Sequence, residues 1–140
     1  MRRAAMTLPE LLIVLAIIGT LLALAVPPIA ASADRAAVHA AAQDIETAFA
    51  GARDEALARR SPVWVVFDTA GGVVRVRPEV GGTRTRALGS LYGVVLRSTR
   101  DSMSYSGWGV GAGAANLTVV VGRGRARDTL VVSRLGRVRR

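Results

Sequence analysis

The chain has 140 residues, of which 51% are hydrophobic, and it contains no cysteine, so disulfides, thiolate metal sites and a cysteine nucleophile are excluded. Its single histidine excludes a metal site built from several histidines. The 19 basic residues, all arginine, and the ten acidic residues leave a net charge of +9.

Charge and glycine are distributed unevenly along the chain. Residues 1–60 hold six arginines and six acids, which cancel, whereas residues 61–140 hold 13 arginines and four acids and so carry the whole net charge. Only Gly19 and Gly51 of the 15 glycines precede residue 61. This pattern predicts helix first and strands with glycine-rich turns afterwards, an α+β fold.

The N-terminal segment is apolar. No charged residue occurs from Leu11 to Val26, and with its neighbours the stretch is long enough to span a membrane as a helix. We expect a transmembrane helix over residues 6–33. Because Arg2 and Arg3 precede it, the positive-inside rule puts the N-terminus in the cytoplasm and the rest of the chain across the membrane.

One carboxylate, Glu10, interrupts the start of this apolar run. Such a group is costly in a membrane helix and usually has a function. A capping box with Thr7 as N-cap is a structural alternative. The A-x-A pattern of residues 31–33 leaves another alternative open, a secreted protein whose signal peptide is removed after Ala33.

The run Ala5-Met6-Thr7-Leu8-Pro9-Glu10-Leu11-Leu12 and the apolar residues after it resemble the type IV prepilin leader. The resemblance implies that prepilin peptidase removes residues 1–5 by cutting between Ala5 and Met6, that Met6 is then N-methylated, and that Glu10 serves assembly. Ala5 and Met6 stand where the family usually has glycine and phenylalanine. In a filament, Glu10 would pair with the free amine of a neighbouring subunit, because an unpaired charge in a low-dielectric bundle is heavily penalised.

Residues 34–60 predict an amphipathic helix on the far side of the membrane. Asp34 is a plausible N-cap, and Pro62 disfavours helix before itself. His39 flanks the apolar face and is interpreted as a surface residue. The apolar positions follow helical spacing at Val38, Ala41, Ala42, Ile45, Ala48, Phe49, Ala52 and Ala56.

From residue 62 the hydrophobic period changes to two, and residues 61–140 predict a β-rich globular head. The first hairpin is expected from residues 63–67 and 73–77, with Val74 and Val76 facing one way and Arg75 and Arg77 the other. Further strands are expected at 91–97, 117–121, 129–133 and around 138, with residues 122–128 as a hairpin tip.

The order of these elements, with Gly136-Arg137-Val138-Arg139 near the end, resembles the GspH/FimT family of minor pseudopilins and minor pilins. The resemblance implies a long helix packed on an antiparallel β-rich head. It also implies a structural subunit of a type II secretion pseudopilus or a type IV pilus, held in the inner membrane by a single pass with the head in the periplasm. Prepilin peptidase and other pilin or pseudopilin subunits are the expected partners.

Enzymatic chemistry has little support in the sequence. Asp54 and Glu55 are adjacent and point to different sides, and His39 lies on a helix needed for packing. The glycine repeats at 107–113 and 122–124 lack the strand-to-helix context of a phosphate loop. We therefore expect no enzyme activity, no cofactor and no metal.

The arginines near the C-terminus allow a second function. Residues 123–140 hold seven arginines against the single acid Asp128. Guanidinium groups bind nucleic-acid phosphates, so a DNA-binding subunit for DNA uptake is the alternative, with Arg137, Arg139, Arg140, Arg123 and Arg125 as candidate contacts. A solvated face or contacts to an acidic neighbouring subunit explain the same cluster. For Trp108, between glycines, the sequence favours a place in the core over an exposed contact.

Overall fold

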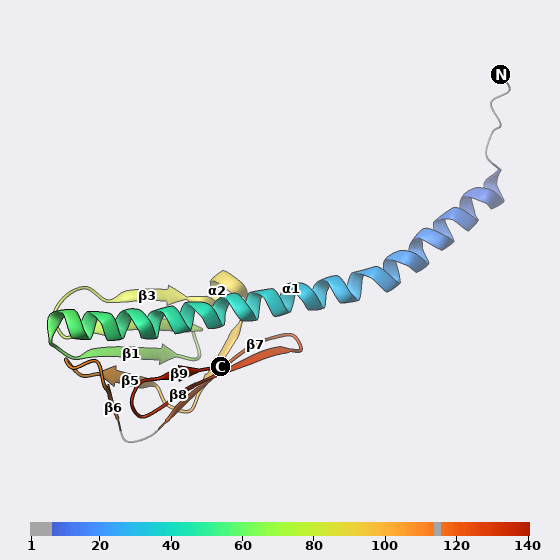
Figure 1. Cartoon of the computed structure of the whole chain (residues 1–140). Helices are drawn as coiled ribbons and strands as arrows, with labels where there is room; N and C mark the ends of the chain where they lie inside the picture. The colour runs from blue at the N-terminus through green and yellow to red at the C-terminus, as the bar shows by residue number, and fades with distance from the viewer. Residues whose placement is uncertain (1–6, 114–115) are drawn as a thin grey trace. The chain divides into compact units, whose positions relative to one another are not determined.

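The computed structural model describes residues 7–113 and 116–140, with the backbone alone for residues 24–28. It contains the long helix α1 (Leu8–Arg59) and the short helix α2 (Leu88–Tyr92). The predicted α+β class is confirmed, since α1 is followed by a β-rich head (Figure 1). The strands in these residues are β1 (Val63–Asp68), β2 (Val73–Pro78), β3 (Arg84–Ala87), β4 (Val95–Ser98), β5 (Ser102–Tyr105), β6 (Gly111–Ala112), β7 (Leu117–Arg123), β8 (Ala126–Val132) and β9 (Val138–Arg139).

The chain divides into two compact units, one ending at Ala33 and the other running from Asp34 to Arg140. The second unit holds two antiparallel sheets, ordered β3-β2-β1-β5-β6 and β4-β7-β8-β9. In the β1–β2 hairpin Val65 is opposite Val76, and in the β7–β8 hairpin Val119 is opposite Leu130. Both hairpins alternate buried and more exposed side chains, as one-sided burial of a sheet requires.

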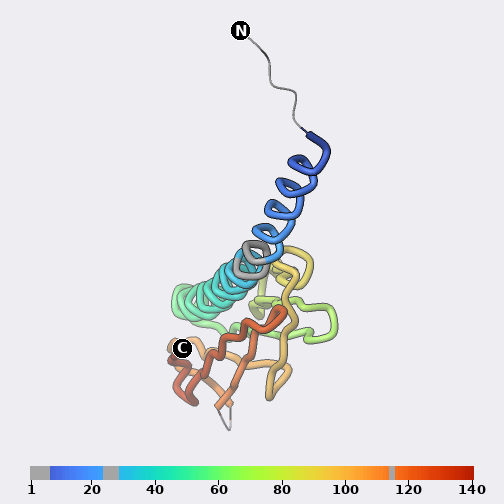
Figure 2. The backbone as a smooth tube through the Cα atoms, turned by 90° about the vertical axis from the view of Figure 1, so that its right-hand side faces the viewer, coloured from blue at the N-terminus to red at the C-terminus, as the bar shows by residue number. Residues whose placement is uncertain are grey.

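The core lies between the second half of α1 and the inner faces of both sheets. The strands curve around one side of this helix segment (Figure 2). Phe49 is fully buried and packs against Phe67, with ring centroids 5.9 Å apart, and edge-on against Tyr105 at 6.4 Å. The predicted helix face is confirmed, since Val38, Ala41, Ala42, Ile45, Phe49, Ala52 and Ala56 are buried and Ala48 packs against them.

Two local predictions are wrong. The strand predicted at 91–97 begins only at Val95, because Leu91 and Tyr92 belong to α2, which ends at Gly93 in a left-handed conformation with its N–H donating to the Gly89 carbonyl, 2.9 Å away. Asp34 is not an N-cap, because α1 begins at Leu8 and continues through that position. The sequence analysis also did not predict β3, β5 or β6, which are short strands with few apolar residues.

Candidate assembly and anion-binding surfaces

The first part of α1 presents apolar side chains on every side. Residues 7–23 are all exposed in the described chain, including large side chains such as Leu8, Ile13 and Leu21. A helix that is hydrophobic all round is normally buried by a membrane or by other helices. Within the described residues no helix has an apolar stretch long enough to cross a membrane.

Glu10 lies in the first turn of this helix, where a carboxylate interacts favourably with the helix dipole. The Thr7 backbone N–H donates to Glu10 Oε2 at 3.4 Å, which is one half of the predicted capping-box alternative, with a long bond. No other hydrogen bond or ion pair of this carboxylate occurs among the described residues. Ala5 and Met6, the predicted cleavage site, lie outside the described residues.

Arg140 ties the C-terminus to α1. Its Nε donates to Asp128 Oδ2 at 2.6 Å, and its Nη2 lies 2.6 Å from His39 Nδ1. Hydrogen bonding by Arg140 lowers the pKa of Asp128, and the same contact raises the pKa of Arg140. His39 is an exposed residue, as predicted, and it has a structural role in closing the chain end onto the helix.

Arg123 is also held within the head. Its Nε lies 2.9 Å from Asp34 Oδ1, and its Nη1 donates to the Tyr92 carbonyl at 2.6 Å. Asp34 therefore connects α1 to the end of β7. Of the five arginines predicted as DNA contacts, Arg123 and Arg140 thus have guanidinium groups occupied by internal partners.

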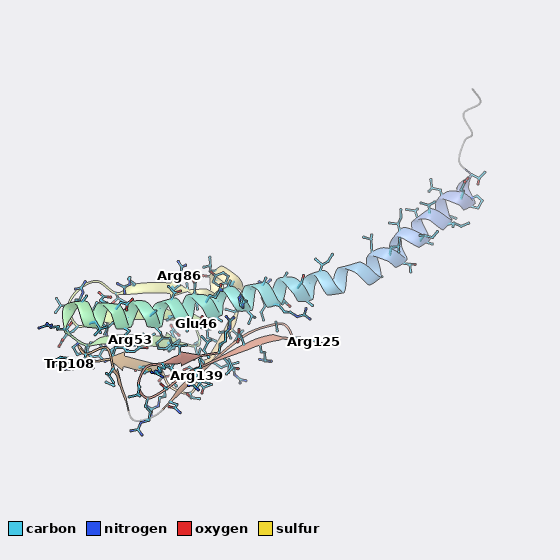
Figure 3. The ribbon with its side chains drawn as sticks, viewed as in Figure 1. Glu46, Arg53, Arg86, Trp108, Arg125 and Arg139 are labelled. Atoms are coloured by element: carbon cyan, nitrogen blue, oxygen red, sulfur yellow. The ribbon has the colours of Figure 1, made fainter. Side chains whose placement is uncertain are left out.

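The other three candidates are exposed and form no ion pair within the described chain. Arg125 lies at the β7–β8 turn, Arg137 precedes β9 and Arg139 lies on β9. Arg137 and Arg139 border an open groove of about 430 Å³, whose opposite wall is α1 with Arg53 and the acids Glu46 and Asp54. Figure 3 shows Arg53 and Arg139 on the same side of the head, with Arg125 further along it. With three guanidiniums against two carboxylates, the lining of the groove has a small excess of positive charge, which lies on the wall formed by Arg137 and Arg139.

Trp108 is not in the core, contrary to the prediction, because its side chain is 85% exposed. The tight turn that carries it directs the indole away from the head (Figure 3). The glycines on either side of Trp108 were the sequence signal for a turn, since glycine allows tight turns, but the sequence does not show whether a turn points into the core or outward. In the described residues no group of three His, Asp or Glu side chains is placed to hold a metal ion.

A long N-terminal helix with an apolar surface, continued into a helix packed on a β-rich head, defines the pilin-like class of fibre subunits. A family model described as Type II transport protein GspH matches residues 41–136, and one described as Prokaryotic N-terminal methylation motif matches residues 1–26. Because the first match covers more than half of the chain, this chain belongs to the GspH family.

Solved structures agree on the fold. Two crystal structures of the type IV minor pilin FimU from Pseudomonas aeruginosa strain PAO1 match with TM-scores of 0.60 and 0.58, at 16% and 15% sequence identity. The matches cover 73% and 72% of this chain and 86% and 90% of the FimU chains. Among curated proteins no significant sequence match is found.

The family consists of structural minor pilins and pseudopilins of type IV pili or type II secretion. The methylation motif implies a membrane-anchored subunit that is processed by prepilin peptidase and assembles with other pilin subunits. The resemblance to GspH/FimT minor subunits drawn from the sequence is therefore confirmed.

Proposed function

We propose that this chain is a minor subunit that assembles through its N-terminal helix into a type II secretion pseudopilus or a type IV pilus. The observation that supports this function best is the apolar surface of α1 from Leu8 to Ala23, where every side chain is exposed and Glu10 is the one charged group. Before assembly, residues 6–33 would span the inner membrane, with the N-terminus cytoplasmic and the head, residues 61–140, in the periplasm.

Assembly would follow from processing. Cleavage between Ala5 and Met6 creates a cationic amine at Met6, which remains cationic after methylation. The Glu10 carboxylate has only a 3.4 Å bond to the Thr7 N–H in the described chain, so most of its acceptor capacity is left for a neighbour. A neighbouring subunit that brings its amine to Glu10 replaces this weak contact by a charge-assisted pair, which is stronger where water is excluded.

Two measurements test this function. Mass spectrometry of the N-terminal peptide from the membrane fraction should find N-methyl-Met6, whereas a chain starting at Asp34 would contradict the proposal. Glu10→Ala should lower incorporation into sheared fibres roughly tenfold or more, as the loss of a charge-assisted pair implies. The control Asp54→Ala, which removes an exposed acid from the second half of α1, should assemble normally.

The two fibre systems can be separated by phenotype. The family description refers to type II transport, whereas the similar solved structures are of a type IV minor pilin. Deleting the chain from its host should abolish secretion of folded exoproteins if it serves a pseudopilus. The deletion should instead reduce surface pili if the chain serves a pilus, and a strain unchanged in both would contradict either function.

DNA binding is a second candidate, favoured by the exposed guanidiniums of Arg125, Arg137 and Arg139 without ion pairs in the described chain. Each phosphate that an arginine neutralises releases counterions, so affinity falls as salt rises. Gel shifts of the full chain in detergent, at several salt concentrations, should show binding that the triple alanine variant weakens. That variant should also reduce the slope of log K against log salt by about 2–3.

The matched control for DNA binding is Arg77→Ala, since Arg77 is exposed on the other sheet, where it lies over the Trp64 ring at 5.6 Å. This control should leave both affinity and slope unchanged. Equal affinities for the original chain and the triple variant would reject these three arginines as contacts.

A further inference from the structure

The turn between β5 and β6 has a hydrogen-bonded backbone and carries the exposed side chain of Trp108. The Ser106 N–H donates to the Val110 carbonyl at 2.9 Å, and the Gly109 N–H donates to the Ser106 carbonyl at 2.8 Å. These bonds close the turn beneath an indole that is 85% exposed. A large aromatic side chain on a hydrogen-bonded turn loses little conformational entropy when a partner covers it.

The same turn is packed against two other segments of the head. A Cβ atom at Gly107 would lie 2.6 Å from the Arg60 carbonyl oxygen, and one at Gly109 would lie 2.7 Å from Leu57 Cγ, so the turn contacts the end of α1 directly. On its other side the Gly111 N–H donates to the Leu135 carbonyl at 3.2 Å. Residues 57–61, 106–111 and 133–137 therefore form one surface, which we call the Trp108 surface.

This surface combines apolar side chains with positive charge. Besides Trp108, it exposes Leu57 (46%), Val110 (44%) and Leu135 (64%). Its three segments contain four arginines and no acid. Arg59 is paired with Glu55 at 3.0 Å, whereas Arg60, Arg134 and Arg137 are exposed and form no ion pair within the described residues.

The backbone at Arg60 is a second, independent feature of this surface. Arg60 has φ +51° immediately after α1, a left-handed position that usually favours glycine. Strained residues of this kind are concentrated at functional sites. At this strained position, beside the Trp108 turn, the chain has a charged arginine where a glycine would fit the backbone better.

We propose that the Trp108 surface binds another pilin-type subunit through an apolar pocket bordered by carboxylates. The proposal rests on the proposed assembly function and adds a head contact to it. Tryptophan and arginine dominate the binding energy of protein interfaces, and the local positive charge requires an acidic border on the partner. A DNA duplex offers phosphates but no pocket for three exposed aliphatic side chains.

Photocrosslinking in cells tests the contact with the full chain and the other pilin subunits of its system. A photoreactive phenylalanine replaces Trp108, and in separate strains Val95, which is 66% exposed outside the surface, and Ile17 on the apolar helix. Position 108 should crosslink to another pilin-type subunit, within a peptide that contains Asp or Glu, and position 95 should not. Position 17 reports helix assembly and so tests the proposed function separately.

Charge reversal then tests the border. For this test the photoreactive residue replaces Val110, so that Trp108 itself can be varied. Arg60→Glu together with Arg134→Glu should reduce the crosslink from position 110 at least tenfold, and so should Trp108→Ala. The matched control Arg97→Glu, an exposed arginine on β4, should leave it unchanged. Circular dichroism should show equal folding for all variants.

Several outcomes would overturn this inference. Crosslinks from position 108 to DNA, to phospholipid or to a copy of this chain would each assign another occupant. Crosslinks from position 17 without any from position 108 would leave assembly intact and reject the head contact. Failure at both positions would reject the assembly function as well.

Discussion

Replacing Gly136 by alanine should destabilise the head strongly. Gly136 has φ +83°, a conformation that disfavours any side chain. A Cβ atom there would also overlap Cε1 of Tyr105. The Tyr105 ring has little room to move, because it is 1% exposed, packs edge-on against Phe49, and donates its hydroxyl to the Gly136 carbonyl at 2.8 Å.

The magnitude follows from two additive costs. The left-handed conformation costs about 1 kcal/mol for alanine relative to glycine. Overpacking against a rigid buried ring costs about 1–3 kcal/mol. The free energy of unfolding should therefore fall by about 2–4 kcal/mol, which lowers Tm by about 10–20 °C for a unit of this size.

Urea and thermal unfolding of the full chain in detergent, followed by circular dichroism, measure this effect. Gly51→Ala is the control, because Gly51 lies inside α1 with open space around it, and it should stabilise by about 0.5–1 kcal/mol. In a Tyr105→Leu background the ring is gone, so Gly136→Ala should cost only about 1 kcal/mol. A loss below about 0.5 kcal/mol in the original background would refute the steric argument.

Three further outcomes follow from the same contacts. Tyr105→Phe leaves the Gly136 carbonyl without its 2.8 Å donor and should cost about 1–2 kcal/mol in urea unfolding. Arg60→Gly removes the strain that a side chain causes at a φ of +51°, so Tm should rise, whereas Gly136→Ala should lower it. The pKa of Asp128 is held below its ordinary value by Arg140, so the stability from this pair is complete above about pH 4 and is lost as pH falls further. Asp128→Asn should therefore be less stable near neutrality, and its stability should fall less steeply with acid.

The spacing of apolar residues predicted the core, because a helix or strand that is buried on one side has its apolar residues at its own structural period. The apolar face from Val38 to Ala56 follows helical spacing, and the β1–β2 hairpin alternates its valines with polar residues, so both could be found from the sequence. The processing site and the function of Glu10 came from family resemblance instead, and they stay predictions until the N-terminus is analysed.

Features that depend on tertiary contacts could not be predicted in this way. The outward direction of Trp108 is set by the contact of its turn with Leu57 and Arg60, which lie about fifty positions earlier in the chain. The arginine cluster appeared uniform in the sequence, yet Arg123 pairs with Asp34 of α1, and Arg140 pairs with Asp128, 12 positions earlier in the chain. Sequence spacing does not show such pairing, so it did not distinguish structural arginines from free ones.

Ion pairs between the two halves of the sequence explain part of their uneven charge. Three acids of α1 form ion pairs with arginines of the head, namely Asp34 with Arg123, Asp44 with Arg86, and Glu55 with Arg84. The acids are ten and eleven residues apart, or about 15 Å along the helix axis.

The alanine-rich face of α1 packs closely on the sheets, but its small side chains interlock little and so do little to stop the helix from sliding along its own axis. Ion pairs at three levels oppose that sliding, because any shift of α1 would separate all of them together. These pairs use three of the 13 arginines of residues 61–140, and exposed arginines without an ion pair in the described chain, such as Arg125, Arg137 and Arg139, are available to partners.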